Sequence, residues 1–181
     1  QGAPRLLRNR GDGFEDVTVD MGLVHEAQGE SAAWGDFDAD GWLDLYIVSW
    51  YFGEDETDPR RQDRLYRNVS GQGFVDVSDW LDVQRLGGPG FAAAFSDLDH
   101  DGDVDLYVVN DKRFGNVLWR NDGPGCSGWC FTDVSATSGA ERPAFSMGIS
   151  VGDFDSDGDF DLYYSSVDEM ILLQNETAQG A

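Results

Sequence analysis

The sequence predicts an all-β fold of propeller-like repeats, each with four antiparallel strands, and three observations support this class. An aspartate-rich motif occurs three times, two further motifs recur around it in a constant order, and short apolar segments alternate with turn signals. No segment shows a sustained 3.6-residue hydrophobic period, so no long helix is expected. Four antiparallel strands form the blade of a β-propeller, and the chain carries about three such repeats.

The aspartate motif joins two strand-like segments in each repeat. It reads DFDADGWLD from Asp36, DLDHDGDVD from Asp97 and DFDSDGDFD from Asp153, at intervals of roughly 55–60 residues. Small residues precede each copy (SAAWG, FAAAFS and GISVG), and a strongly apolar segment follows it (LDLYIVSW, VDLYVVN and FDLYYSS). The segments before and after the motif are predicted to be strands A and B of a blade.

Two shorter motifs predict strands C and D. The strand C motif reads LLRN at Leu6, LYRN at Leu65, LWRN at Leu118 and LLQN at Leu172. The strand D motif reads GFEDVT from Gly13, GFVDVS from Gly73 and CFTDVS from Cys130. Turn residues separate the two motifs in each unit, as expected for neighbouring antiparallel strands. One helical turn is also compatible with the stretch 79–83.

The strand order divides the single repeat domain, residues 1–181, into two complete and two partial blades. Residues 1–30 carry strands C and D, residues 31–79 and 91–135 carry all four strands, and residues 144–177 carry strands A, B and C. Propellers typically close with about 4–8 blades, so no closed ring is expected from this chain on its own. Bare sheet edges favour self-association or strand donation between chains.

The spacing of the aspartates predicts three calcium sites. Calcium takes about six to eight oxygen ligands, and carboxylates on alternate residues of a tight loop converge on one ion. Glycine at the sixth loop position permits the sharp turn, and an aspartate at the ninth position closes the loop, unlike the glutamate of an EF-hand. The predicted ligands are Asp36, Asp38, Asp40, Trp42 and Asp44; Asp97, Asp99, Asp101, Asp103 and Asp105; and Asp153, Asp155, Asp157, Asp159 and Asp161, with Trp42, Asp103 and Asp159 acting through their backbone carbonyls.

The DxDxDGxxDL loop, with the strand C and strand D motifs around it, resembles the FG-GAP/VCBS repeats of integrin-α-type propellers and of many secreted bacterial proteins. The resemblance extends over nearly the whole chain. It gives the same loop positions the role of calcium ligands, and it implies a β-propeller blade as the structural unit.

The charge of the chain excludes some classes of partner. The formal net charge is -23, and phosphate binding needs the opposite sign, so nucleic acid is not expected. No apolar run approaches the roughly 20 residues that span a bilayer, so membrane insertion is not expected either.

Two pairs of residues bear on the compartment. Cys126 and Cys130 are predicted to form a local disulfide, which implies an oxidising compartment and an extracellular or cell-surface location; the alternative is two reduced thiols. Asn68 and Asn175 lie in N-x-S/T sequons at equivalent repeat positions. They are either N-glycosylation sites or turn residues that end a strand, and both interpretations stay open.

The remaining side chains favour packing or contact over catalysis. His25 and His100 form no constellation with serine or cysteine, and His100 is expected to face solvent, so no enzyme is predicted. The insertion EDETDPRRQDR from Glu54 is the candidate variable contact surface. Packing between blades is preferred to sugar stacking for the aromatic residues Trp34, Trp42, Trp50, Tyr51, Trp80, Trp119 and Trp129.

These observations predict a secreted, calcium-binding structural or adhesive protein that self-associates head to tail into a fibre or surface assembly. The alternative is a ligand-binding segment of a larger propeller, from a receptor or a carbohydrate-active protein, with a protein or glycan ligand. The shape of the particles in the presence of calcium distinguishes the two.

Overall fold

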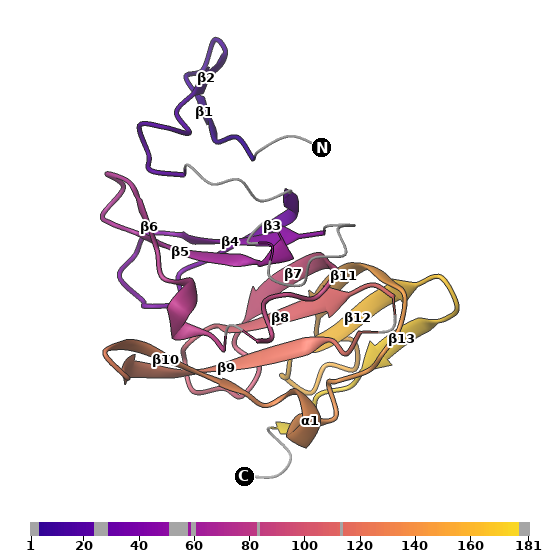
Figure 1. Cartoon of the computed structure of the whole chain (residues 1–181). Helices are drawn as coiled ribbons and strands as arrows, with labels where there is room; N and C mark the ends of the chain where they lie inside the picture. The colour runs from indigo at the N-terminus through magenta and orange to yellow at the C-terminus, as the bar shows by residue number, and fades with distance from the viewer. Residues whose placement is uncertain are drawn as a thin grey trace.

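The computed structural model describes residues 4–23, 29–50, 58, 61–82, 84–112 and 114–177. Within these residues the regular secondary structure is almost entirely β-strand in antiparallel sheets, which confirms the predicted fold class (Figure 1). The helical elements described are a 3₁₀ turn at Ser78–Trp80 and the single-turn helix α1 at Ser135–Ser138. The strands are β1 Leu7–Asn9, β2 Phe14–Asp16, β3 Gly29–Gly35, β4 Asp44–Ser49, β5 Arg64–Asn68, β6 Phe74–Asp76, β7 Gly90–Ser96, β8 Asp105–Asn110, β9 Val117–Gly125, β10 Gly128–Asp133, β11 Ser146–Gly152, β12 Asp161–Ser166 and β13 Met170–Leu173.

The described strands form an N-terminal hairpin and three larger sheets. The hairpin pairs β1 with β2, the first sheet has the order β3-β4-β5-β6, the second β7-β8-β9-β10 and the third β11-β12-β13. Within each sheet, every strand pairs antiparallel with the strand that follows it in sequence. In the part of the chain that the structure describes, these sheets do not close into a barrel or ring.

The sheets stack face to face with an apolar core in each interface. Strand β4 shows the pattern: Tyr46 and Val48 face the second sheet, whereas Leu45 and Ile47 face the N-terminal hairpin. Strand β8, in the second sheet, likewise faces the first sheet with one set of alternate side chains and the third sheet with the other. Because both faces of β4 and β8 are covered, their sequences are almost continuously apolar rather than alternating.

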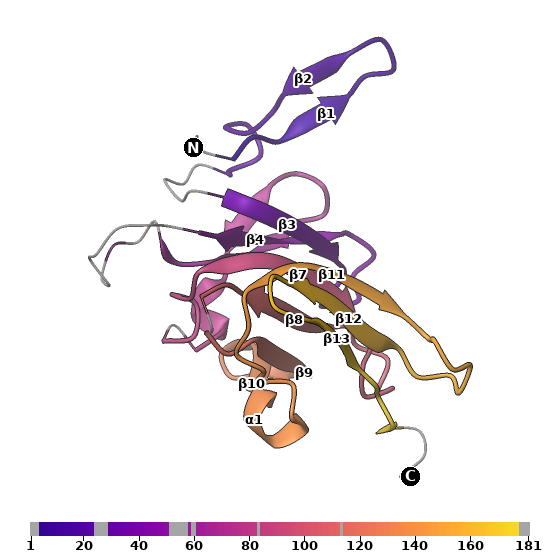
Figure 2. The same ribbon diagram turned by 90° about the vertical axis from the view of Figure 1, so that its right-hand side faces the viewer.

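The small residues of the A strands allow the sheets to approach closely. Strand β7 lies between β3 and β11, as Figure 2 shows. A Cβ atom on Gly35 would lie 2.4 Å from the Phe95 ring, and one on Gly90 would lie 2.4 Å from Val48. Larger side chains at these two positions would therefore push the neighbouring strands apart.

Among the described residues, nothing covers one face of the third sheet. Tyr46 pairs with Leu65 and Tyr107 pairs with Leu118 on faces that the following sheet buries. The equivalent pair in the third sheet is Tyr163 with Leu172, and here Tyr163 is 41% exposed. The exposed face therefore corresponds, position for position, to faces that are interfaces elsewhere in the stack.

Candidate metal-binding site

The three aspartate loops, residues 36–44, 97–105 and 153–161, share one backbone conformation. The fourth position is left-handed in each loop, with φ of 53° at Ala39, 62° at His100 and 64° at Ser156. The sixth position is Gly41, Gly102 or Gly158, with φ of 88°, 97° and 99°. Glycine adopts this conformation without the steric cost that other residues carry, which explains why it recurs at the sixth position.

The first aspartate of each loop holds this turn closed. The amide of Gly41 donates to Asp36 Oδ2 at 2.9 Å, and the matching bonds to Asp97 and Asp153 measure 3.2 Å. A carboxylate that accepts these amides must lie inside the loop, beside the other aspartates. The loop backbone therefore gathers like charges in a small volume.

The gathered carboxylates form three groups in the described part of the chain. In each group one oxygen per residue lies within 4.8 Å of the others. The groups are Asp36, Asp38 and Asp40; Asp97, Asp99 and Asp101; and Asp153, Asp155 and Asp161. The first two groups use loop positions one, three and five, whereas the third uses positions one, three and nine.

The ninth aspartate has a structural role that the sequence interpretation did not include. Asp44 accepts the amide of Phe37 at 3.0 Å and the amide of Asn68 at 2.7 Å, so it ties its own loop to strand β5. Asp105 and Asp161 accept the equivalent pairs of amides. Burial raises the pKa of Asp44 to about 7 and that of Asp105 to about 6, against the lowering effect of these bonds.

Two buried carboxylate oxygens indicate that the loops are suited to bind a cation. Asp38 Oδ1 and Asp97 Oδ1 are fully covered, and neither has a hydrogen-bond partner within the protein. A buried acceptor without a partner is costly, and a hard divalent cation is a partner that aspartate oxygens satisfy well. The donor set consists of oxygens, which suits calcium rather than zinc or copper. These residues therefore fit the ion that the sequence predicts.

The third residue of the strand C motif lies next to the loops, and the sequence interpretation gave it no role. Arg67 donates from Nε to Asp38 Oδ2, and its Nη2 lies 3.4 Å from Asp40 Oδ2. Its counterpart Gln174 donates to Asp155 Oδ2 at 2.8 Å. The other counterpart, Arg120, pairs with Asp122 at 2.7 Å, and its charge still acts on Asp99 of the second loop. The sequence signal that could have pointed to this position was the recurrence of the strand C motif in every repeat.

His100 is less free than expected. Its Nε2 lies 2.6 Å from Asp159 Oδ1, which links the second loop to the third, and the side chain is 39% exposed. The side chain is exposed, as expected, and the stacking of the sheets adds a contact with the neighbouring loop. His25 lies outside the described residues.

The asparagine that ends the strand C motif connects successive sheets. Asn121 Nδ2 donates to the carbonyl of Phe37 at 2.8 Å, and Asn175 Nδ2 donates to the carbonyl of Leu98 at 2.7 Å. Both acceptors occupy the second position of the preceding sheet's aspartate loop. The second and third sheets therefore each fasten the loop of the sheet before them.

The side chains of both sequon asparagines make structural hydrogen bonds. Asn68 is buried and donates from Nδ2 to the carbonyl of Leu43 at 2.9 Å, while its Oδ1 accepts the amide of Gly71. Asn175 donates from the same atom to Leu98. The turn role is thus visible at both positions, and glycosylation stays a prediction.

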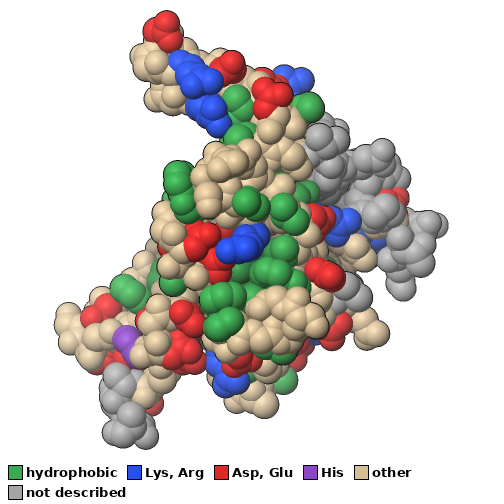
Figure 3. All heavy atoms as spheres, turned by 90° about the vertical axis from the view of Figure 1, so that its left-hand side faces the viewer, with side chains coloured by type: hydrophobic (Ala, Val, Ile, Leu, Met, Phe, Trp, Pro, Cys, Tyr) green, Lys and Arg blue, Asp and Glu red, His purple; other side chains and the backbone are tan. Residues whose placement is uncertain are grey.

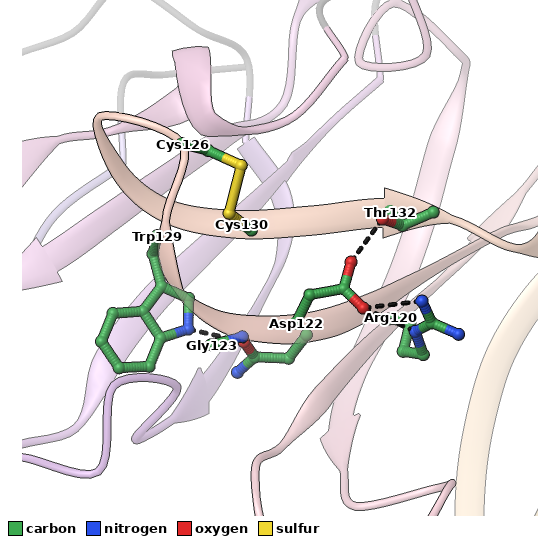
Figure 4. Close-up of a disulfide and its surroundings, with 8 residues drawn as sticks. Arg120, Asp122, Gly123, Cys126, Trp129, Cys130 and Thr132 are labelled. Atoms are coloured by element: carbon green, nitrogen blue, oxygen red, sulfur yellow. Dashed lines mark hydrogen bonds and ion pairs between the residues drawn. A yellow bond between two sulfur atoms is a disulfide. The ribbon is translucent and has the colours of Figure 1, made fainter.

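The two cysteines are joined in a disulfide at the tip of the hairpin formed by β9 and β10 (Figure 4). Their Cα atoms are 5.5 Å apart. Beside the bridge, Asp122 accepts hydrogen bonds from Arg120 and from the Thr132 hydroxyl, and Trp129 donates from its indole to Asn121. The bridge therefore closes a hairpin whose two strands are also joined by side chains.

The predicted aromatic residues divide into packed and exposed groups. Trp119 is buried, and Trp80 and Trp129 pack edge-on against Phe37, with ring centroids 6.0 and 6.2 Å away. Trp34 and Trp42 are exposed on the side of the first sheet near the N-terminal hairpin. Trp50 packs against Phe91. Tyr51 lies outside the described residues, as does most of the insertion that begins at Glu54.

Acidic side chains lie in several separate groups on the face seen in Figure 3, with basic side chains beside several of them. The described residues contain no helix long and apolar enough to cross a membrane.

Stacked antiparallel sheets, each with an aspartate loop between its first two strands, define a propeller-like β-repeat protein. The chain belongs to the FG-GAP-like repeat family, whose pattern matches residues 1–47 and 97–164. It is also similar to cartilage acidic protein 1 of Homo sapiens, with 26% identity over 175 residues that cover 91% of this chain. The match covers 24% of that relative, so the chain spans about a quarter of its length.

Proposed function

We propose that this chain is a non-enzymatic, calcium-stabilised structural or adhesive module of an extracellular protein. The observation that carries the proposal is the threefold recurrence of one loop geometry, with three carboxylate oxygens within 4.8 Å in every copy. Asp38 Oδ1 and Asp97 Oδ1, buried without a partner, support a cation in the first two loops.

Calcium would act on stability rather than on chemistry. Asp36, Asp38 and Asp40 would hold one ion, the equivalent aspartates of the second loop a second, and Asp153, Asp155 and Asp161 a third. The ion would supply positive charge where carboxylates now repel one another. Because the unfolded chain has no preformed site, binding contributes directly to folding free energy.

A thermal melt with and without calcium tests this proposal. Millimolar calcium is expected to raise the melting temperature of EDTA-treated protein, and magnesium at the same concentration is expected to raise it less, because magnesium gives up its water reluctantly. The variant Asp38→Asn is the matched probe, since it keeps the shape of the side chain and removes one ligand charge. An unchanged midpoint after calcium addition to the EDTA-treated wild type would sink the proposal.

An extracellular location is supported by two features of this chain. The Cys126–Cys130 disulfide favours an oxidising compartment, and a similar protein bears the name cartilage acidic protein 1. A structural or adhesive role is in keeping with the described loops, which offer repeated carboxylates but no nucleophile and base in contact.

A more specific form of the proposal is that copies of this chain associate with one another, and the exposed face of the third sheet supports it. Tyr163, Met170 and Leu172 are all at least 41% exposed at positions that match buried interfaces elsewhere. Sedimentation and negative-stain microscopy with calcium present test it. Rings or filaments are the expected result, and a monomer at all concentrations would contradict it.

A ligand-binding segment of a larger propeller is the second candidate. The open hollow lined by Trp34, Trp42 and Arg8 beside the N-terminal hairpin favours it, because exposed tryptophans with a nearby guanidinium suit glycan stacking. Quenching of tryptophan fluorescence by soluble glycans, lost in Trp42→Ala, would support this role over self-association.

A further inference from the structure

A polar pocket of about 330 Å³ lies between the first and second sheets, both of which have all four strands. Three segments line it: residues 61–62 before β5, residues 84–88 before β7, and residues 110–117 from the end of β8 into β9. Strands β4 and β8 start at their aspartate loops and end beside these segments. The pocket therefore lies at the opposite end of the sheets from the aspartate loops.

Backbone hydrogen bonds fix one wall of the pocket to both sheets. The amide of Asp63 donates to the carbonyl of Leu86 at 2.9 Å, and the amide of Asp111 donates to the carbonyl of Pro89 at 2.9 Å. The segment that enters β7 is thus fastened to the first sheet and to the second. A wall that is already ordered reduces the entropy cost of binding a ligand.

Asn110 brings a hydrogen-bond acceptor to this pocket. The residue is only 3% exposed, and its Nδ2 donates to the carbonyl of Gly115 at 2.8 Å, which fixes the side-chain amide. Its Oδ1 accepts no hydrogen bond from the described residues. A Cβ atom on Gly88 would lie 2.9 Å from this oxygen, so the glycine leaves the space beside it open. A ligand hydroxyl in the pocket would give the buried oxygen a partner, which such groups usually have.

Arg85 contributes a donor whose orientation is fixed. Its Nε lies 2.8 Å from Asp133 Oδ2 and its Nη2 lies 3.0 Å from Glu141 Oε1, while Nη1 makes no such contact with the described residues. These two carboxylates offset the charge of the guanidinium. Arg61 also lines the pocket, but the formal charge of the chain, -23, opposes an anionic ligand. The pocket therefore suits an uncharged ligand that accepts hydrogen bonds.

Two amides and an aromatic ring complete the lining. Gln62 Oε1 accepts a hydrogen bond from Arg64 at 3.1 Å, which leaves Nε2 as a donor, and Gln84 adds a second side-chain amide. The Phe114 side chain is 50% exposed, and its backbone amide donates to the Asp111 carbonyl at 3.1 Å. An accessible ring beside several amide and guanidinium groups matches a ligand with one apolar face and hydroxyls around its rim, which is the character of a sugar ring.

We propose that this pocket binds one neutral sugar unit of a glycan. A sugar hydroxyl donates to Asn110 Oδ1, other hydroxyls accept from Arg85 Nη1 and from the Gln62 amide, and the C–H face of the ring packs on Phe114. The volume lies at the lower end of the range of about 300–1,000 Å³ for small-molecule sites, which suits a single sugar unit. The site goes beyond the proposed calcium-stabilised role, since it uses none of the aspartate loops.

Saturation-transfer difference NMR on the whole chain with calcium present tests the site. The probes are the methyl glycosides of glucose, galactose, mannose and N-acetylglucosamine, with methyl glucuronide as the acidic comparison. We expect saturable binding of at least one neutral glycoside and weaker binding of the glucuronide. No saturable binding of any neutral probe, or binding of the glucuronide alone, would overturn the proposal.

Two independent variants locate the binding to the pocket. Gly87 lines it, and a Cβ atom there meets nothing within 4 Å, so Gly87→Trp should fill the space and abolish binding. Gly13→Trp, at an equally open glycine of the N-terminal hairpin, is the matched control and should bind normally. Phe114→Ala should weaken binding at least about fivefold, whereas Phe14→Ala, which removes a ring that is 72% exposed in the hairpin, should not. Circular dichroism checks that the variants fold, and either pocket variant alone decides.

The outcome is separable from the other tests. Binding that persists in Gly87→Trp but is lost in Trp42→Ala would belong to the hollow beside the N-terminal hairpin and would overturn the assignment to this pocket. A missing calcium effect on the melting temperature would contradict the metal sites and leave the glycoside titration readable. A missing glycoside signal in a protein that calcium stabilises would contradict the sugar site alone.

Discussion

The Tyr46 hydroxyl donates a hydrogen bond of 2.7 Å to Asp63 Oδ2 inside the core between the first and second sheets. The amide of Ser49 donates to the other carboxylate oxygen, also at 2.7 Å, and Asp63 is only 3% exposed. Burial raises the pKa of Asp63 to about 7, against the lowering effect of these two bonds. The equivalent position of the second sheet holds Asn116, whose Nδ2 donates to the Tyr107 hydroxyl at 3.1 Å.

Asp63 is expected to make stability fall as the pH rises toward 7. Between the ordinary aspartate pKa of 3.8 and the folded value of about 7, the folded state binds more protons than the unfolded state. The free energy of unfolding then decreases by up to about 1.4 kcal/mol per pH unit from this group. Asp63→Asn should remove that part of the slope in urea denaturation between pH 5 and 8. Asn116→Asp should add a similar pH dependence from the second sheet. Parallel plots of unfolding free energy against pH for the wild type and both variants would contradict the assignment of this slope to Asp63.

Arg67 is expected to weaken calcium binding in the first loop. Its guanidinium contacts Asp38 and Asp40, so an incoming divalent cation meets a positive charge that the third loop replaces with Gln174. Even with the screening of bulk water, removing one charge a few ångströms from the ion is worth about 1 kcal/mol, so Arg67→Gln should raise calcium affinity at least about fivefold. Calorimetric titration at low salt measures this.

Arg120→Gln is the control for the arginine experiment. Arg120 pairs with Asp122, so its loss should change calcium affinity much less. Equal effects of the two substitutions would mean that only net charge matters.

Phe37 and Phe154 occupy the same loop position but are expected to differ in their effect on stability. Phe37 is fully buried among the aromatic rings of the following sheet, whereas Phe154 is 55% exposed because no described sheet follows it. Phe37→Ala should destabilise the chain by about 3–5 kcal/mol, and Phe154→Ala by less than about 0.5 kcal/mol. Chemical denaturation of both variants gives the comparison, and similar losses would show that the loop position, not the interface, carries the energy.

Asn121 is expected to be important for holding the first and second sheets together. Truncation leaves the Phe37 carbonyl and the Trp129 indole without their partner in a buried region. Asn121→Ala should therefore cost about 2–4 kcal/mol of unfolding free energy. The exposed Asn9, which ends the same motif and accepts only the Gly11 amide, is the control, and Asn9→Ala should cost less than about 1 kcal/mol. Equal losses of stability for the two substitutions in a calorimetric melt would contradict this role of Asn121.

Much of the fold could be predicted because short sequence patterns within each repeat determine its strands and turns. The apolar segment after each aspartate loop predicted β4, β8 and β12, and the glycine at the sixth loop position predicted the turn. Side chains that act between sheets were harder to find. The bond from Asn121 to Phe37 joins residues 84 positions apart, and no spacing within one repeat encodes it.

The site was predicted in outline but not in its partners. Alternation of aspartates indicated which carboxylates meet, yet it did not distinguish those that face a cation from Asp44, which ties two strands together through backbone amides. The contact between His100 and Asp159 depends on how the second and third sheets stack, which is a tertiary property. Such contacts depend on the approach of separate sheets rather than on local sequence.

The separate cores of the stack determine how it would respond to force. A load applied across the sheets passes through the hairpin interface and the two sheet interfaces in series, so the weakest of them sets the strength of the whole. The core behind the N-terminal hairpin is the smallest, because the hairpin supplies only two short strands to cover Leu45 and Ile47. Under tension the hairpin should detach first and leave the two larger interfaces intact, so that the module lengthens in steps instead of rupturing at once.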